Sequence, residues 1–140
     1  MIDVEHGHAA CVEVWWTRVA GGASAAVALR ALERGFGAVW ARASVTLGDV
    51  TMIAIGDRVL SDAATMYPIA AALRLEATGI SCEDLERDSD AIDRAELEAA
   101  SRLVLVELLT VLGRLTGDVL TPALHAELCA DTDADQESAP

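Results

Sequence analysis

Two histidines and a cysteine near the amino terminus are of the types that bind metal ions. His6, His8 and Cys11 are close in sequence, and neutral imidazole and thiolate are ligands that suit zinc. A structural zinc site needs four ligands, and the fourth is missing here. Walker loops and the sequences C-x-x-C, H-E-x-x-H and G-x-S-x-G are also missing. We therefore expect no metal, no cofactor and no catalytic centre of these kinds.

His125 is a candidate phosphoacceptor in the stretch T-P-A-L-H-A-E-L. A histidine on a bundle helix resembles the site of histidine phosphotransfer domains, which would imply a phosphorelay function. Such a site needs cationic or glycine neighbours that stabilise the phosphoryl group and admit a partner. His125 is instead followed by Ala126 and Glu127, and the chain contains no lysine. A phosphorelay intermediate that uses His125 is kept as an alternative, and we expect no phosphate transfer.

Two carboxylates interrupt strongly apolar helical stretches. Asp57 and Glu107 have no basic residue three or four positions away. A buried carboxylate without a partner has a raised pKa or costs roughly several kcal/mol. Arg58 and Arg114 are the nearest arginines in sequence, and we interpret all four residues as buried polar groups that fix the register of a bundle. The alternative is a small-molecule-binding bundle with Asp57 or Glu107 in its pocket.

Helices are the elements that must position these residues. Ser24 is suited to cap a helix that runs to about residue 43. A second helix is predicted over 49–66, apolar on nearly two faces and therefore central, and Tyr67-Pro68 ends it. The longest helix is predicted over 91–115, with Asp90 and Asp93 at its start. Shorter segments complete the prediction: a helix over 69–73, an extended L-R-L-E, an acidic turn that ends near residue 87, and a helix over 123–130.

Two pentapeptides nearly repeat, L-G-D-V-T at 47–51 and L-G-R-L-T at 112–116. They fall in different helical contexts, so a duplicated functional motif is not the interpretation that we adopt. Gly48 and Gly113 are interpreted as points at which two backbones pack closely. Thr51 and Thr116 are expected to bond to nearby carbonyls.

The sequence therefore predicts an all-α, compact bundle of four to six helices. Residues 1–23 are assigned to a loose N-terminal arm, because V-E-V-W-W-T-R-V alternates too imperfectly for a strand and Gly21-Gly22 marks a break. The bundle domain is expected over 24–130. The acidic tail over 131–140 is mostly polar and is expected to be disordered.

Composition and charge exclude several classes of protein. The chain has 140 residues, 53% of them hydrophobic, which suits one domain. Its net charge of −13 argues against binding to nucleic acid. The longest apolar run, over 103–113, is far too short to insert into a membrane. The start lacks the features of a signal peptide, and the three cysteines are odd in number and widely spaced. We expect a bacterial-style cytoplasmic protein with free thiols.

Trp15, Trp16 and Trp40 are the candidate interaction residues. Positive hydropathy, with Trp15-Trp16 close to a glycine pair, predicts apolar surface that a partner or second subunit covers. The function that we expect is a non-catalytic protein-interaction or regulatory helical module of unknown pathway, which forms a homodimer and is not an enzyme.

Overall fold

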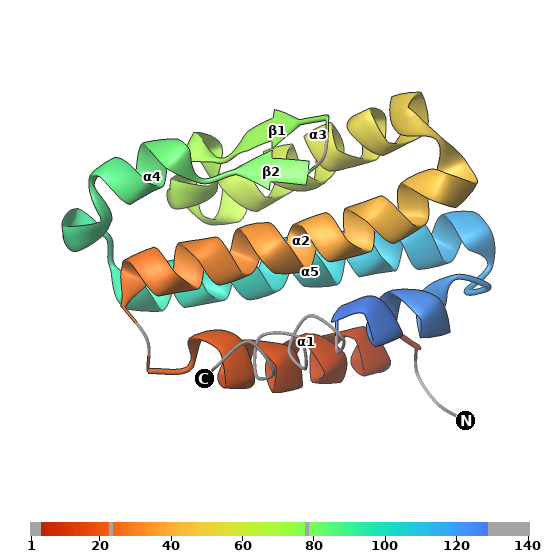
Figure 1. Cartoon of the computed structure of the whole chain (residues 1–140), viewed down its shortest axis with the longest axis horizontal. Helices are drawn as coiled ribbons and strands as arrows, with labels where there is room; N and C mark the ends of the chain where they lie inside the picture. The colour runs from red at the N-terminus through yellow and green to blue at the C-terminus, as the bar shows by residue number, and fades with distance from the viewer. Residues whose placement is uncertain (1–3, 23, 78, 129–140) are drawn as a thin grey trace, which may run out of the picture.

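The computed structural model of the chain describes residues 4–22, 24–77 and 79–128 (Figure 1). In chain order the elements are α1 (Val4–Ala20), α2 (Ala25–Leu47), α3 (Asp49–Met66), the 3-10 helix η1 (Pro68–Ala72), β1 (Arg74–Glu76), β2 (Gly79–Ser81), α4 (Glu83–Arg87), the 3-10 helix η2 (Ser89–Ala91), α5 (Arg94–Thr116) and a last helix over 121–128. Within these residues the fold is the predicted all-α bundle, with six α-helices and one small hairpin. The tail predicted to be disordered, 131–140, lies outside the described residues.

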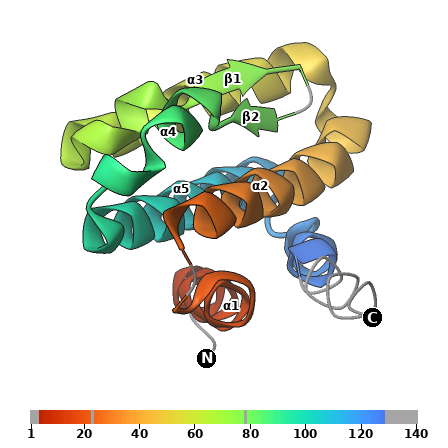
Figure 2. The ribbon, with the colours of Figure 1, turned by 60° about the vertical axis from the view of Figure 1, so that its left-hand side comes forward.

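The helices form three layers (Figures 1 and 2). α2 and α5 lie side by side in the middle. α3 and the hairpin cover one side of this pair, and α1 with the helix over 121–128 covers the other. No helix in the described ranges is long and apolar enough to cross a membrane.

Helix caps lie where the sequence predicts them. The side chain of Ser24 accepts a hydrogen bond from the backbone N–H of Val27 at 3.3 Å, and α2 begins at the next residue. Asp93 caps α5 by accepting from the N–H groups of Ala95 and Glu96. The helix begins three residues later than predicted, because 89–91 form the separate turn η2. Side-chain caps satisfy N–H groups that have no partner within the helix.

Residues 4–20 form helix α1, so the loose N-terminal arm is a correction to the prediction. Val12, Trp15 and Trp16 lie on one face of α1 and are at most 1% exposed. Their spacing of three and four residues is that of a helix that buries one stripe. The imperfect alternation of this segment therefore reflects helical periodicity.

α3 is a surface helix, so its predicted central position is wrong. Met52, Val59 and Ala63 are fully buried, whereas Val50 is 84% and Ile53 46% exposed. The helix is thus buried on one face only. The middle layer consists of α2 and α5 (Figure 1).

The extended L-R-L-E stretch is the first strand of a short antiparallel hairpin. Leu75 of β1 pairs with Ile80 of β2. The indole N–H of Trp40 on α2 donates to the backbone carbonyl of Ala77 at 3.1 Å, which ties the hairpin to the middle layer. A two-stranded hairpin alone is marginal in water, so it depends on this packing.

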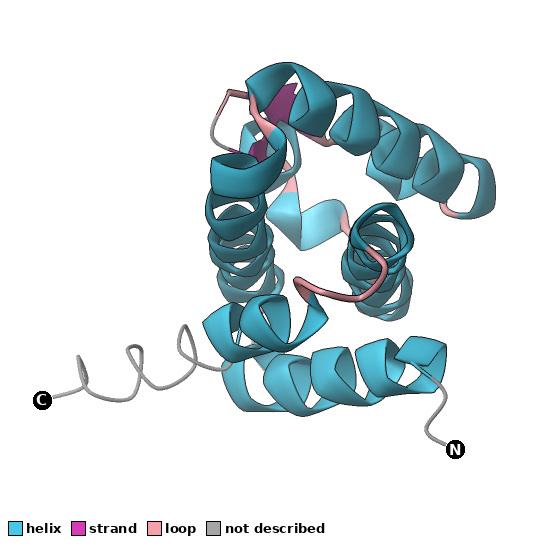
Figure 3. Ribbon diagram, turned by 90° about the vertical axis from the view of Figure 1, so that its right-hand side faces the viewer, coloured by secondary structure: helices cyan, strands magenta, loops and turns pink. Residues whose placement is uncertain are grey.

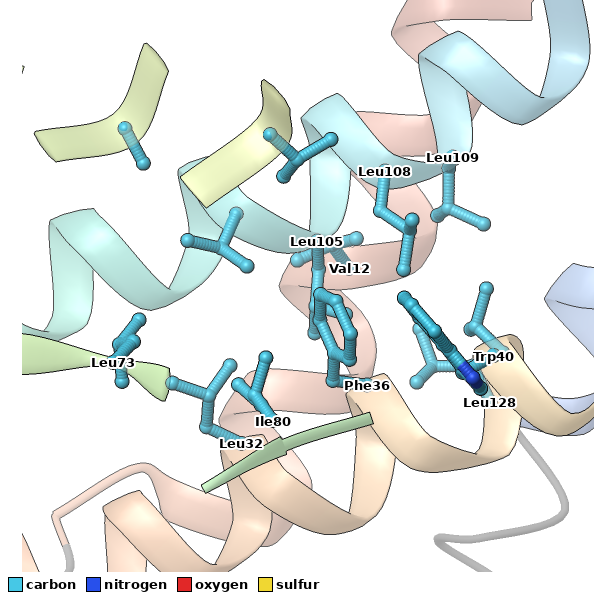
Figure 4. Close-up of a cluster of buried hydrophobic side chains, with 14 of the residues drawn as sticks. Val12, Leu32, Phe36, Trp40, Leu73, Ile80, Leu105, Leu108, Leu109 and Leu128 are labelled. Carbon is cyan, nitrogen blue, oxygen red and sulfur yellow. The ribbon is translucent and has the colours of Figure 1, made fainter. Parts of the chain in front are cut away.

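The core is made of aliphatic side chains around a few rings (Figure 4). Phe36 and Trp40 of α2 stack with centroids 5.7 Å apart. Leu105 and Leu108 of α5 belong to the same cluster and are fully buried. Ile80 joins them from the hairpin.

The two pentapeptide glycines have different roles. Gly48 has a φ of +84° and nothing within 4 Å of the place that a Cβ would take, so close packing is the wrong explanation there. It allows the sharp joint between α2 and α3, because a positive φ costs glycine little. Gly113 is closely approached, as predicted, but by side chains: a Cβ would lie 2.7 Å from Asp118 Oδ1 and 3.4 Å from His8 Nε2. Thr116 bonds to the carbonyl of Leu112.

Candidate functional site

His8 and His125 form a hydrogen-bonded pair between the first and last described helices. Nδ1 of His8 lies 2.9 Å from Nε2 of His125, and the rings meet edge to face at 84°. His8 is 2% exposed and His125 is half-buried. Such a bond needs a proton on one facing nitrogen and a lone pair on the other. The end view in Figure 3 shows the two helices side by side.

The chain reaches this pair through an unusual turn. Gly117 and Asp118 both have left-handed backbones, with φ of +60° and +64°. The Asp118 carboxylate accepts a hydrogen bond from the hydroxyl of Thr121 at 3.2 Å. This turn reverses the chain at the end of α5 and places the helix over 121–128 beside α1.

Burial, and then the neighbouring His8, lower the pKa of His125 below its ordinary value of 6.5. Both causes disfavour the imidazolium form. The Nε2 atom of His125 is engaged by His8, which does not suit a phosphoacceptor that must meet a partner domain. The geometry therefore describes a pair of histidines, one buried and one half-buried, in which the neutral form of His125 is favoured.

The proposed metal ligands do not come together in the described part of the molecule. His8 bonds to His125, and Cys11 is a half-buried thiol. The side chain of His6 lies outside the described residues. Among the side chains that are described, no three His, Cys, Asp or Glu residues are grouped so that they could hold a metal ion.

A second polar cluster joins the end of α1 to the start of α5. The indole N–H of Trp16 donates to Glu98 at 3.1 Å. Arg94 donates to the carbonyl of Ala20 at 2.7 Å, and its guanidinium lies 5.8 Å from the centre of the Trp16 ring. A cation over an indole face is attracted to it. These contacts hold a buried tryptophan in one orientation.

An ion pair links the same helices one turn further along. Nε of Arg102 on α5 lies 2.8 Å from a carboxylate oxygen of Glu13 on α1. Both side chains are partly exposed, so solvent screens the pair and its contribution is modest.

The three predicted interaction tryptophans belong to the core. Trp15, Trp16 and Trp40 are 1%, 0% and 2% exposed. A partner therefore cannot contact them on the surface of this fold. They pack between the layers of helices instead.

The four predicted buried polar residues are not buried together. Asp57, Arg58 and Arg114 are exposed, and Glu107 is half-buried on α5. Arg58 pairs with Asp62 one turn along α3, at 3.9 Å. The prediction of buried ion pairs fails for the three exposed residues: Asp57 and Arg58 lie on the solvent face of α3, and Arg114 lies in the exposed last turn of α5.

An open cavity of about 340 Å³ lies between α2, the start of α3 and the hairpin. Its lining residues are Trp40, Ala41, Ser44, Asp49 and Ala77. Neither Asp57 nor Glu107 lines it. The cavity contains one carboxylate and one hydroxyl, and it has no nucleophile paired with a base.

Large apolar side chains are exposed at one end of the bundle. We define the apolar end as the side chains of Val45, Val50, Ile53, Leu115 and Val119, which are between 46% and 84% exposed. They come from the α2–α3 joint and from the end of α5 with the loop after it. Both lie at the same end of the bundle in Figures 1 and 2.

The opposite end, formed by α4, η2 and the start of α5, is acidic (Figure 1). Residues 83–96 contain seven carboxylates and two arginines. By contrast, residues 45–53 contain one carboxylate, and residues 114–120 contain one carboxylate and one arginine. The carboxylates are thus concentrated at one end of the bundle, and five of the exposed apolar side chains gather at the other.

The His8–His125 pair and the Trp16–Glu98 contact were not predicted from the sequence. The helical spacing of α1 could have placed His8 and Trp16 on its buried face, because His8 stands four residues before Val12 and eight before Trp16. No sequence signal shows which residue on a distant helix faces either side chain.

Comparison of the chain with models of protein families, with curated proteins and with solved structures gave no match. The proposed function therefore depends on the geometry of this chain alone.

Proposed function

We propose that the protein is a non-catalytic protein-interaction module that binds through the apolar end and associates there with a second copy of itself. The observation that carries this proposal is the exposure of Val45, Val50 and Ile53 around a single helix joint. Apolar groups gathered on one surface are typical of interaction sites. Burying them against a partner contributes about 25 cal/mol for each Å² removed from water.

The distribution of charge supports a second copy as the partner. Two chains of net charge −13 repel each other, and the repulsion is weakest when the acidic ends point away from one another. Contact through the apolar end has this geometry. It also presents the same surface from both copies, as a two-fold dimer requires.

The alternatives have less support from the geometry. A phosphorelay through His125 would need an accessible imidazole, and this one is half-buried and bonded to His8. A small-molecule pocket around Asp57 or Glu107 is not supported by the cavity, which is lined by neither. Cys11 and Cys82 are reduced cysteines, which suits the reducing bacterial cytoplasm that we propose as the compartment.

The proposal is tested by sedimentation velocity from micromolar to several hundred micromolar protein. We expect the wild type to dimerise and Val50→Asp to be monomeric over the same range. Val50 lies in the first turn of α3, where a carboxylate is tolerated, so the variant should fold. Met66→Asp is the matched control, because Met66 is 64% exposed at the far end of the same helix.

Two results would contradict the proposal. A wild type that stays monomeric at every concentration would remove self-association. A Met66→Asp variant that weakens the dimer as much as Val50→Asp would show that the apolar end is not the contact surface.

A further inference from the structure

We propose that His8 and His125 form a pH-sensitive latch that holds the helix over 121–128 against α1 at neutral pH and releases it in acid. The latch is built on the 2.9 Å contact between two ring nitrogens. It does not depend on the proposed self-association, because it acts within one chain.

The number of protons on the two rings decides whether the contact survives. With both rings neutral, one facing nitrogen donates and the other accepts. One added proton leaves an imidazolium that donates to a neutral imidazole, so the bond is kept. A second proton puts N–H groups on both facing nitrogens and two positive charges at contact distance, and the bond is lost. The second protonation therefore breaks the bond and opens the latch.

Apart from this bond, the helix over 121–128 is stabilised mainly by its apolar contacts. An isolated helix of eight residues is marginal in water. Its apolar contacts come from Leu124 and Leu128, both 0% exposed, together with Leu120 at 7%. The turn before it has left-handed backbones at Gly117 and Asp118, a conformation that is uncommon for residues other than glycine, although aspartate adopts it more often than most. A change at the histidine pair therefore acts on a short segment whose other attachment is the burial of these leucines.

The charged and titratable groups nearby come from each element that packs at the pair. On these elements they include Cys11 on α1, Arg114 on α5, Asp118 in the turn and Glu127 on the last helix, and Asp118 is the one with a side chain beside Gly113, as His8 is. The Asp118 carboxylate and Nε2 of His8 both approach Gly113, at 2.7 Å and 3.4 Å from the place that a Cβ would take there. The second proton meets the charge of the first, in a partly dry site. Burial and His8 accordingly lower the pKa of His125.

The direction of the effect follows from the proton count. The released helix exposes His125 to water, where it binds a proton more readily than in the closed state. Lower pH therefore favours the open form, starting below the ordinary pKa value of 6.5. For each additional proton bound on opening, the ratio of closed to open molecules falls up to about tenfold per pH unit.

The experiment measures amide protection factors by NMR on the full chain between pH 7.5 and pH 4.5. Protection factors correct for the intrinsic pH dependence of exchange. In the wild type we expect protection over 121–128 to fall by about tenfold or more as the pH decreases, while protection in the middle of α5 is kept. In His125→Gln the pH dependence over 121–128 should disappear, because the Gln carbonyl still accepts from His8 but cannot be protonated.

Two outcomes would overturn the latch. One is the same pH dependence over 121–128 in the wild type and in His125→Gln, since the carboxylates of the acidic chain would then be responsible. The other uses the wild type alone and remains decisive if His125→Gln fails to fold. Titration of the imidazole C–H resonances should show two separated steps, with loss of protection at the second; protection that persists after both steps would refute the proposal.

Discussion

The indole ring of Trp15 lies directly against Gly35, in a space that any other side chain at position 35 would occupy. A Cβ at Gly35 would lie 2.8 Å from Cη2 of Trp15 and closer still to Cζ2. Trp40 uses Gly56 of α3 in the same way, with its Cζ3 2.7 Å from a Cβ position there. Two of the three tryptophans thus pack against a glycine on the neighbouring helix. Gly35 and Gly56 occur inside long helices because a side chain there would clash with a tryptophan ring.

Gly35→Ala should destabilise the fold by about 1–3 kcal/mol, the usual cost of overpacking a core. The added methyl group must displace the Trp15 ring, because the neighbouring core leaves no room for it. Urea unfolding followed by tryptophan fluorescence measures the change. Gly7→Ala is the control: nothing lies within 4 Å of a Cβ at Gly7 in α1, so that variant should be neutral or slightly more stable. Equal losses from both substitutions would contradict the packing explanation.

Trp16→Phe should cost about 1–2 kcal/mol in the free energy of unfolding, because it removes the N–H donated to Glu98 and weakens the stacking of Arg94. A double-mutant cycle with Glu98→Ala, which removes the acceptor, isolates the first contact. We expect a coupling of about 0.5–1.5 kcal/mol. Strictly additive losses would show that the hydrogen bond does not contribute to stability.

The thiol of Cys82 should be unreactive in the native protein. Burial, followed by the charges of Glu33 and Glu86, raises its pKa far above the ordinary value of 9.0. The reactive thiolate is therefore scarce at pH 8, and the side chain is fully buried. Mass spectrometry after brief alkylation should find Cys82 unmodified in the folded state and modified in urea. Cys11, which is half-buried, is the internal comparison. Alkylation of Cys82 at the rate of Cys11 in the folded protein would count against its burial.

The same pKa shift predicts a loss of stability in alkali. The folded state keeps the Cys82 proton while the unfolded state releases it, so stability is present below the unfolded pKa of about 9 and decreases as pH rises above it. Cys82→Ala should remove this pH dependence at the cost of a small cavity. Urea unfolding at pH 8 and pH 10 in both proteins measures the difference.

Asp57→Ala should change stability by less than about 0.5 kcal/mol, because the side chain is exposed. Glu107→Leu, at a half-buried position of α5, should stay within about 1 kcal/mol of the wild type. Urea unfolding of the two variants measures the change in the free energy of unfolding. A loss of about 3–5 kcal/mol in Glu107→Leu would indicate a buried ion pair after all.

Local signals in the sequence predicted most of the helices correctly. Ser24 caps α2 as expected, and α3 spans 49–66 as predicted, because Tyr67-Pro68 ends a helix whatever surrounds it. Capping and proline restriction act within one turn, so they can be inferred from a few residues. The hairpin was only partly predicted, since the L-R-L-E strand needs β2 and the surface of α2 to be stable.

The amino-acid sequence was enough to predict the helical class, the caps and the acidic balance of this chain. It could not assign the sides of the helices: Asp57 was expected inside and is exposed, while Trp15 and Trp16 were expected at a partner surface and are buried. Packing of the folded chain set these placements and brought His8 to His125, 117 positions apart. Periodicity fails here because it identifies an apolar stripe but not what covers it. The same apolar stripe can be covered by a neighbouring helix, by a second subunit or by a segment that carries a glycine. Close packing of the whole chain decides which of these covers it.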